Sequence, residues 1–443
     1  MKRFIYFNLF MLIASVAFTV PTQGQEALRL QDAIAIALEE NFDIRIEKLR
    51  EEIAVNNNTW GNAGLFPQLS LVANQQNGYN DQDNPASFIN GQFETHSINV
   101  GAEANWTLFN GLRVYVNKDR LETLAQQSRG NATLVIQNTV QATILAYEQA
   151  ILEKEKLQVQ KNLKDLSKDE YFYNLEKEAL GSIGSYDLLQ VKNAYLTDSA
   201  NYINQEVNTR NAQRSLNLLL GLPFDTAFYL IDSLVPPVNT YRYEALEGRL
   251  LSKNQNLKNQ YINQRIRQYD YQLARRNLYP TIDLRSGIQQ TENSLTFETP
   301  DGERSNQGNT FNYYFNFSLS FNVYNGGQTQ RAIDNAEIEK DIAALTTQQL
   351  EESVKNELRI AVDNYNTRLK VYAINKANLK TAELNLRLSR EKYQNGTISS
   401  FDFRDVQNNF MQISSNTLES VYNLIESHTE LLRLTGGILS TTE

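Results

Sequence analysis

Few residues of this chain are of the types that carry out covalent or metal chemistry. The sequence holds two histidines, His96 and His428, and no cysteine, so it has no thiolate nucleophile and no His/Cys set for a transition metal. It also lacks a glycine-rich phosphate loop, a nucleophile elbow and a zinc-helix motif. His428 falls on an apolar helical stripe with Leu424 and Leu431, which predicts a packed, hydrogen-bonded side chain. We therefore expect a protein that is not an enzyme and that has neither cofactor nor metal centre.

One pair of carboxylates has a spacing that suits a binding surface. Asp402 and Asp405 lie three residues apart at the expected start of the last helix, so their side chains share a face. Copies of this pair around a constriction would favour cations and offer a site for a divalent metal plug. Alternatively, Asp402 stabilises the N-terminus of its helix through the helix dipole. Asp187 has the same place in an earlier helix, which favours the stabilising role for one carboxylate per turn.

The elements that position these residues occur twice, roughly 215 residues apart, which indicates an internal repeat. Residues 65–71 (LFPQLSL) return as 278–284 (LYPTIDL), 108–111 (LFNG) as 323–326 (VYNG), and 181–187 (GSIGSYD) as 396–402 (GTISSFD). Each half thus contains a short helical start, two strands, and two long helices that meet at a tight turn. We expect a signal peptide at 1–24, a first structural repeat at 25–222, a connector at 223–242 and a second structural repeat at 243–439.

The N-terminus and the overall charge limit the compartment and the partners. Lys2 and Arg3 precede an apolar run at 4–20, and small residues near Gly24 suit cleavage, which predicts a signal peptide; an uncleaved anchor is the alternative. The chain has 42 basic and 51 acidic residues and no basic patch, which argues against nucleic acid as a partner. No other run approaches the roughly 18 apolar residues of a membrane helix, so further membrane contact must come through strands.

Four segments alternate between apolar and polar residues with a period of two, as strands with one apolar face do. In the last of them, Phe315, Phe317 and Leu319 share a face, and Asn316 and Ser318 share the other. The strands are long enough to cross a bilayer when tilted, which needs about 9–11 residues. A soluble sheet over a core is the alternative. The expected strands are at about 66–78, 96–109, 280–291 and 311–324.

Aromatic residues gather at the expected strand ends, as at a membrane interface. They are Phe66, Trp106, Phe109, Tyr279, Phe311 and Tyr324. Two long polar segments, 78–95 and 292–310, are expected to be extracellular loops. Four strands cannot close a membrane barrel, which needs at least about eight, so the chain must oligomerise. Two copies would give eight strands and three would give twelve, and the residues do not choose between them.

Long stretches without proline or glycine predict helices of unusual length. The expected long helices at 112–180 and 328–395 would measure on the order of 100 Å at 1.5 Å per residue, and shorter return helices follow at 186–220 and 401–435. Their apolar positions step by three and four, as in a coiled coil. A soluble coiled-coil rod would explain these helices equally well, but it does not explain the strands.

Together these motifs resemble the TolC-like outer-membrane efflux proteins of Gram-negative bacteria over nearly the whole mature chain. The resemblance implies a mainly α fold with transmembrane β: a trimeric 12-stranded β-barrel, four strands per protomer, continuing into a long α-helical coiled-coil periplasmic tunnel. It implies a passive exit duct of a tripartite efflux or type I secretion system. The implied partners are a periplasmic adaptor (membrane fusion) protein, an inner-membrane pump such as an RND-type or ABC transporter, and outer-membrane lipid.

The resemblance also implies roles for residues at the two helix–helix turns. The aspartate rings of the family's periplasmic aperture match Asp402 and Asp405, and its gate contacts match Tyr393 and Asp187. The gate arginine falls on Ile398, so hydrogen bonds or packing would have to hold the closed state here. The adaptor is expected to contact the turns at Gly181, Ser182, Ile183, Gly184, Gly396, Thr397, Ile398 and Ser399.

A function of another class, a secreted or periplasmic coiled-coil scaffold or adhesin with a β head, is the alternative. Only a membrane channel would need detergent for extraction. The exported substrate, the pump and the adaptor are not specified by the sequence.

Overall fold

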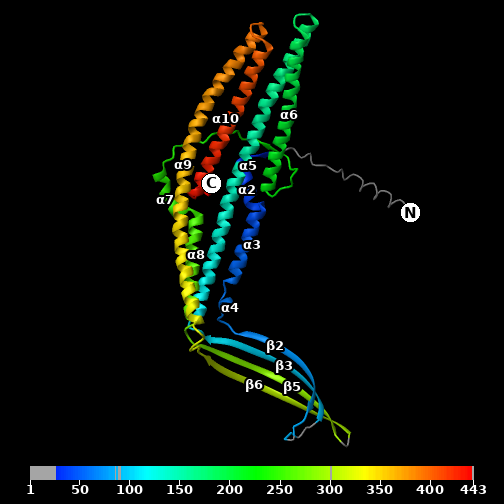
Figure 1. The fold of residues 1–443 in the computed structure, drawn as a ribbon, viewed down its shortest axis with the longest axis vertical. Coiled ribbons are helices and arrows are strands. Elements are labelled where there is room, and N and C mark those ends of the chain that lie inside the picture. Colours follow the sequence, from blue (N-terminus) through cyan, green and yellow to red (C-terminus); the bar gives the residue numbers. More distant parts are fainter. Residues whose placement is uncertain (1–25, 85, 88–90, 300–301, 442–443) are drawn as a thin grey trace, which may run out of the picture.

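We describe the protein from a computed structural model, which covers residues 26–84, 86–87, 91–299 and 302–441. The expected signal peptide at 1–24 lies outside these residues. The chain is an extended molecule, with two helical hairpins at one end and a four-stranded sheet at the other (Figure 1). None of the helices in the described ranges is long and apolar enough to span a membrane.

The two halves repeat the same order of elements. The first half comprises β1 (Glu26–Leu28), α2 (Leu30–Glu40), α3 (Phe42–Asn57), α4 (Trp60–Ala63), β2 (Gln68–Gln82), β3 (Gly91–Phe109), α5 (Arg113–Ala179) and α6 (Ser185–Leu219). After β4 (Phe228–Leu230), the second half comprises α7 (Tyr243–Lys253), α8 (Gln255–Arg276), β5 (Thr281–Thr299), β6 (Gly302–Ser320), α9 (Gln328–Gln394), α10 (Ser400–Leu434) and a 3₁₀ turn η1 (Ile438–Thr441). The long helices α5 and α9 each have 67 residues, and the return helices α6 and α10 each have 35.

The four long strands form one antiparallel sheet in the order β2-β3-β5-β6. The inner strands β3 and β5 join the two halves, and β2 and β6 are the edges of the sheet. Their pairing is regular except for a register shift between Thr107 and Phe109, where β3 approaches its helix. Among the described residues, no further strand pairs with these edges, so each protomer offers two open strand edges.

The strands extend much farther into the polar segments than the sequence predicts. β2 reaches Gln82, β3 begins at Gly91, and β5 and β6 leave only 300–301 between them. The expected long loops at 78–95 and 292–310 are therefore wrong. Backbone pairing does not depend on side-chain polarity, and polar residues here also bond across the strands, as Tyr79 Oη does to Gln92 Oε1 at 2.6 Å.

The end of the last strand is also corrected. β6 ends at Ser320, so Tyr324 lies beyond the strand, and Phe311 lies in the middle of it, paired with Gln290. The prediction that Phe311 lies at a strand end is therefore wrong.

One face of the sheet is apolar and uncovered in the single chain. Cross-strand partners share a face, and the pairing aligns Leu71 with Ala102, Ile288 and Tyr313. Leu71 is 89% exposed and Phe317 on the same face is 71% exposed. Because contiguous apolar surface of this extent is rare on soluble monomers, this face must be covered by lipid or protein.

The buried core lies in the midsection, where the connector crosses the long helices. β4 in the connector pairs in parallel with β1, so the connector contains a short strand. Two fully buried tyrosines hold it: Tyr147 of α5 donates to the Leu28 carbonyl or to Asp232, and Tyr365 of α9 donates to the Pro237 carbonyl at 2.6 Å. The connector is thus fastened to both long helices.

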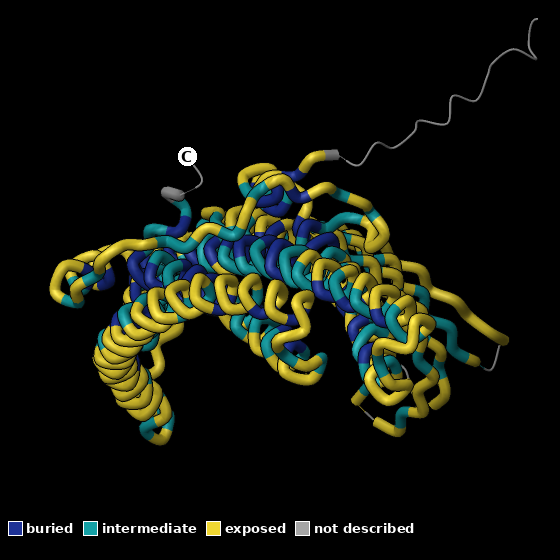
Figure 2. Tube along the Cα trace, turned by 90° about the horizontal axis from the view of Figure 1, so that it is seen from above, coloured by how far each residue is buried: buried dark blue, intermediate teal, exposed yellow. Residues whose placement is uncertain are grey.

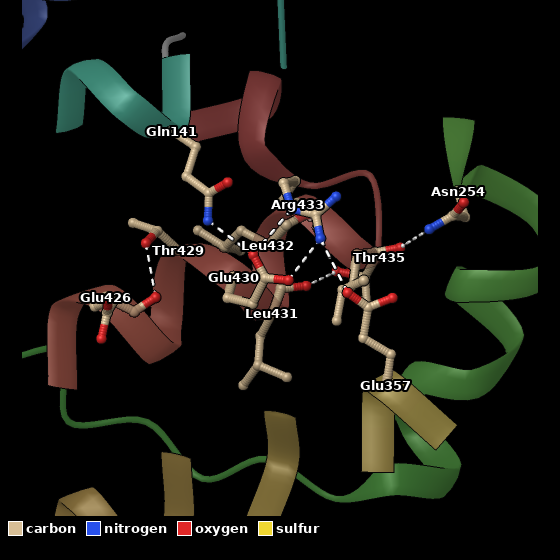
Figure 3. A network of polar contacts seen from close by, with 11 residues as sticks. Gln141, Asn254, Glu357, Glu426, Thr429, Glu430, Leu431, Leu432, Arg433 and Thr435 are labelled. Atoms are coloured by element: carbon tan, nitrogen blue, oxygen red, sulfur yellow. Dashed lines mark hydrogen bonds and ion pairs between the residues drawn. The ribbon is translucent and has the colours of Figure 1, made fainter. Parts of the chain in front are cut away.

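A polar network fixes the C-terminal end of α10 in this midsection (Figure 3). Arg433 donates to Glu430 at 2.6 Å and to Glu357 of α9 at 3.3 Å, and Gln141 of α5 donates to Glu430 at 2.8 Å. α10 is thereby tied to both long helices. Viewed along the long axis, the helices lie side by side in an open arc and do not close into a bundle (Figure 2).

His428 is packed and hydrogen-bonded, as the apolar stripe predicts. Its Nε2 lies 2.8 Å from Tyr241 Oη, and its ring stacks on that tyrosine. Burial lowers the pKa of His428, which favours the neutral imidazole.

Candidate functional site

Both hairpin tips have the same backbone geometry. After α9, Gly396 adopts φ 72°, and the N–H of Thr397 donates to the Lys392 carbonyl at 2.8 Å. Gly181 (φ 71°) and Ser182 repeat this arrangement after α5. This is the Schellman ending, in which glycine adopts the left-handed conformation and orphan carbonyls find partners. It fixes where each long helix stops and where the return helix begins.

The residues expected to contact an adaptor lie in these two turns, at the far end of the molecule from the sheet (Figure 1). Ile183 and Ile398 are half-buried and the others are exposed: Gly181, Ser182, Gly184, Gly396, Thr397 and Ser399.

Asp402 forms a capping box with Ser399 at the start of α10. Ser399 Oγ accepts from the Asp402 backbone N–H at 3.1 Å, and Asp402 Oδ2 accepts from the Ser399 hydroxyl at 2.6 Å and its backbone N–H at 3.1 Å. These bonds to the hydroxyl and backbone of Ser399 lower the pKa of Asp402. The stabilising role considered for Asp402 is therefore present in the structure.

The other two aspartates at the tips are exposed to solvent. Asp405 lies one turn along α10 from Asp402. Asp187 lies in the first turn of α6, where Gly184 precedes the helix and offers no capping side chain. Asp187 therefore does not repeat the capping box of the second hairpin.

Tyr393, the last of the expected aperture residues, is buried between the two hairpins. Its hydroxyl accepts from Asn174 Nδ2 of α5 at 2.8 Å, and its ring stacks on Phe403 with centroids 5.1 Å apart. Within the part of the chain that the structure describes, Tyr393 forms no hydrogen bond with Asp187. The structure therefore ties Tyr393 to α5 and α10, not to the first-half aspartate.

An ion pair that the sequence did not reveal joins the return helices of the two hairpins. Arg404 of α10 donates to both carboxylate oxygens of Asp198 on α6, each at 2.7 Å. The Asp198 side chain is 1% exposed and that of Arg404 is 22% exposed. Although Ile398 stands at the expected arginine position, an arginine–aspartate bridge does hold the hairpins together here, one helical turn deeper.

The same cluster reaches α5 through Gln407. Gln407 Nε2 donates to Glu170 Oε1 at 2.5 Å, and Gln407 Oε1 accepts from Arg404 at 3.3 Å. Asn174, which donates to Tyr393, also donates to the Glu170 carbonyl at 2.7 Å. We call the residues Glu170, Asn174, Asp198, Tyr393, Arg404 and Gln407 the tip network; it connects α5, α6, α9 and α10.

Glu170 is the titratable group of the tip network with the largest perturbation. Burial raises its pKa to about 7, against the opposing effects of the Gln407 bond and of Arg404 and Arg390. It borders a cavity of about 270 Å³ that is also lined by Tyr173, Arg390 and Phe403. A carboxyl group with such a pKa changes its charge near neutral pH.

A signal for the tip network is present in the sequence, although it is faint. Val191, Asp198 and Gln205 are seven residues apart and all buried, so a charged residue occupies the coiled-coil seam of α6. A buried carboxylate requires a partner, which points to an arginine on a neighbouring helix. Only the fold identifies it as Arg404.

Five of the six predicted interface aromatics lie near the junction of strands and helices. Trp106 Nε1 donates to the Leu65 carbonyl at 2.8 Å, and Phe66 and Tyr279 are 62% and 50% exposed. Phe109 ends β3 and Tyr324 follows β6, whereas Phe311 lies elsewhere, as described above. Among the described residues, no group of histidines and carboxylates is arranged to hold a metal ion.

Comparisons with known proteins agree with this architecture. The sequence profile of the family described as "Outer membrane efflux protein" matches residues 33–222 and 246–437. A sequence search of curated proteins gives no match.

Several solved structures share the fold at low sequence identity. A membrane protein from Pseudomonas aeruginosa superimposes with a TM-score of 0.74 at 18% identity, covering 92% of this chain and 93% of the other. The CmeC outer membrane channel of Campylobacter jejuni gives 0.73 at 16%, covering 92% and 85%. The open-state MtrE outer membrane channel of Neisseria gonorrhoeae gives 0.69 at 18%, covering 93% and 89%.

Proposed function

Because the chain belongs to the outer membrane efflux protein family, and is therefore an outer-membrane channel of Gram-negative efflux systems and not an enzyme, we propose that three copies form one continuous duct. The four strands of each copy contribute to a single 12-stranded barrel. The long helices contribute to a tunnel that ends at the hairpin tips. The duct is passive, and the inner-membrane pump would supply the energy for export.

The main observation in support of the trimer is that the sheet of a single copy is incomplete. Each copy has an uncovered apolar face and two strand edges, β2 and β6. An open edge in lipid costs several kcal/mol for each unsatisfied backbone group. Pairing β6 of one copy with β2 of the next removes every edge, places the apolar face in lipid and turns the polar face to the lumen. The open arc of helices (Figure 2) suits the same symmetry.

We assign the periplasmic aperture to the hairpin tips. Asp405 and Asp187 are exposed there, and Asp402 combines its capping bonds with an exposed position. Three copies would bring these carboxylates around one axis and favour cations in the passage. The tip network would hold the hairpins of each copy together and keep this aperture narrow. Tyr393 contributes from inside that network, through Asn174.

The exposed tip turns are the proposed contact for a periplasmic adaptor protein, which would join the duct to an inner-membrane pump of the RND or ABC type. The turns are rigid, because their Schellman bonds fix them, and they are mostly exposed. This combination suits a docking surface.

The test is the number of protomers in the detergent-extracted mature protein, measured by light scattering corrected for bound detergent. Three copies, together with ion conductance in a planar bilayer, are expected. A stable monomer, or extraction without detergent, would contradict the duct and favour the coiled-coil scaffold.

A further inference from the structure

A polar pocket lies at the junction between the sheet and the helices, at the opposite end from the tip network. It has a volume of about 520 Å³. Its walls come from the ends of β5 and β6 and from α5, α8 and α9, which meet at the base of the helical region (Figure 1). Its polar lining includes Arg113, Arg276, Asn110, Asn277, Asn322 and Gln328.

Two arginines give this pocket its charge. Arg113 donates to Asn277 Oδ1 at 2.7 Å, and the Arg276 guanidinium lies over the Tyr279 ring, 5.8 Å from its centroid. Within the described ranges of the chain, neither guanidinium forms an ion pair with a carboxylate, although the whole chain carries a net charge of −9. The carboxylate on this sheet face in β5, Asp283, accepts from Thr107 at 2.7 Å and does not line the pocket.

The pocket opens on the polar face of the sheet. Thr281 pairs with Ser320, and both line it. They alternate with Ile282 and Leu319, which belong to the apolar face. In the proposed duct the polar face lines the lumen, so a ligand would reach this pocket from the passage and not from the lipid.

The internal repeat shows that the fold itself does not require these arginines. Arg113 and Gln328 are the first residues of the two long helices. Arg276 lies two residues before the Leu-Tyr-Pro motif, and the residue two positions before the matching Leu-Phe-Pro motif is Ala63. The matching positions of the other repeat therefore carry no arginine, although the same elements form there.

We propose that this pocket binds a small oxyanion, such as a phosphate or carboxylate group, as it passes through the lumen. The inference rests on the proposed duct, because only that assembly makes the pocket a lumenal site. Guanidinium groups bind phosphate and carboxylate through paired N–H donors, and Arg113 retains further donors beyond its bond to Asn277. The surrounding amides of Asn110, Asn322 and Gln328 add donors.

The site would make the duct selective in two stages. Carboxylates at the tips favour cations, whereas arginines at the junction retain anions. An exported molecule that carries both charges would find a complementary group at each end.

Binding is tested first on detergent-solubilised protein, without requiring a channel. The ³¹P linewidth of pyrophosphate is measured during titration with wild-type protein and with the Arg113→Gln/Arg276→Gln variant. Gln is the residue that the other repeat has at the position of Arg113, so this change is compatible with the fold. The matched control is Arg275→Gln, since Arg275 is adjacent and exposed but does not line the pocket.

We expect wild type and the Arg275→Gln control to bind pyrophosphate and the double variant to bind it at least tenfold more weakly. Equal binding by all three proteins, or no binding by wild type, would overturn the site. A second titration uses dihexanoyl phosphatidylglycerol, whose phosphate is a lipid headgroup. Arginine-dependent binding of this lipid but not of pyrophosphate would place the pocket at the membrane surface and overturn the lumenal assignment.

A bilayer recording then separates this site from the duct itself. Pyrophosphate added on the side of the sheet should reduce the KCl current of wild type and of Arg275→Gln, but not that of the double variant. Wild type that conducts without any block would overturn the oxyanion site and leave the duct intact. Absence of conductance in all three proteins would instead reject the proposed function.

Discussion

At the scale of single residues, the tip network shows how a coiled-coil surface is made specific. Asp198 occupies a seam position where an apolar residue would pack well, and it is stable there only because Arg404 donates to both of its oxygens. Such a pair is weak evidence for net stability, but removing one partner leaves a buried charge alone. We therefore expect the pair to act mainly on which helices meet and in which register.

Replacing Arg404 with Leu should destabilise the packed hairpins by roughly 3–5 kcal/mol, because Asp198 stays buried without its partner. We expect a lower midpoint of thermal unfolding and a larger resting conductance. The Arg404→Leu/Asp198→Leu double variant should recover most of the stability. If the double variant loses as much as the single one, the pair does not hold the hairpins as described.

Glu170 makes the stability of the tip depend on pH. Its folded pKa of about 7 is above its ordinary value of 4.5, so the folded state binds more protons than the unfolded state between these values. Stability of the tip should therefore be greatest below about pH 4.5 and fall as pH rises to about 7, by about 1.4 kcal/mol per pH unit at most. Hydrogen exchange of residues 166–175 measures this slope.

Two substitutions test whether Glu170 causes this pH dependence of the stability of the tip. Glu170→Gln should abolish the slope at the tip. Glu148, in the midsection, also has a pKa raised to about 7, chiefly by burial, so Glu148→Gln is a matched control that should leave the tip unchanged. An unaltered slope in Glu170→Gln would assign the pH dependence to another group.

We expect Asp405 to contribute to the cation selectivity of the proposed aperture. Asp405→Asn should move the reversal potential in a KCl gradient toward zero, because one carboxylate per copy leaves the aperture. Asp225→Asn, an exposed change in the connector, should have no effect. The same reversal potential in wild type and Asp405→Asn would remove Asp405 from the aperture.

At the scale of elements, helix ends are encoded locally, whereas strand ends are not. Gly181 and Gly396 adopt positive φ and stop the long helices within a residue of the predicted ends. The strands continue far past their apolar stretch, because a ladder of backbone bonds tolerates Asn and Gln as readily as Phe. The alternation therefore predicts where the lipid contact lies and not where the strand stops.

The same contrast holds for the candidate site. The positions of Asp402, Asp405 and the tip turns at the ends of helices are local in sequence, so motifs at fixed offsets predict them. The Arg404–Asp198 pair joins residues 206 positions apart, and it exists only because α6 and α10 come together at the tip. Sequence spacing alone carries no such information.

The tip turns supply a prediction at this scale. Gly396→Ala should destabilise the second hairpin by about 1–2 kcal/mol, because an L-residue is strained at φ 72°. Gly184→Ala is the comparison, since Gly184 has φ −83° and nothing within 4 Å of an added Cβ. Thermal unfolding of both variants measures the difference, and equal midpoints would show that the positive φ is not required.

At the scale of the whole molecule, the membrane assignment depends on which face of the sheet meets lipid. Phe317 and Ser318 are neighbours on opposite faces of β6. In the proposed duct, Phe317→Lys places a charge in lipid at a cost of roughly 2–4 kcal/mol near the midplane, whereas Ser318→Lys faces the lumen. We expect the first variant to assemble poorly and the second to form trimers, as measured by native electrophoresis. The opposite result would reverse the faces of the barrel.

The equal length of α5 and α9, 67 residues each, constrains how such a molecule evolves. In the proposed duct, both arms start at one sheet and end at one aperture. An insertion in a single arm would therefore raise one tip above the other by about 1.5 Å and rotate it by about 100° for each inserted residue. Only paired insertions near multiples of seven keep both the level of the tips and the seams. The length of the helical region should therefore change only in steps of about seven residues. Among relatives, differences in tunnel length should appear as insertions or deletions of whole heptads that match in the two halves.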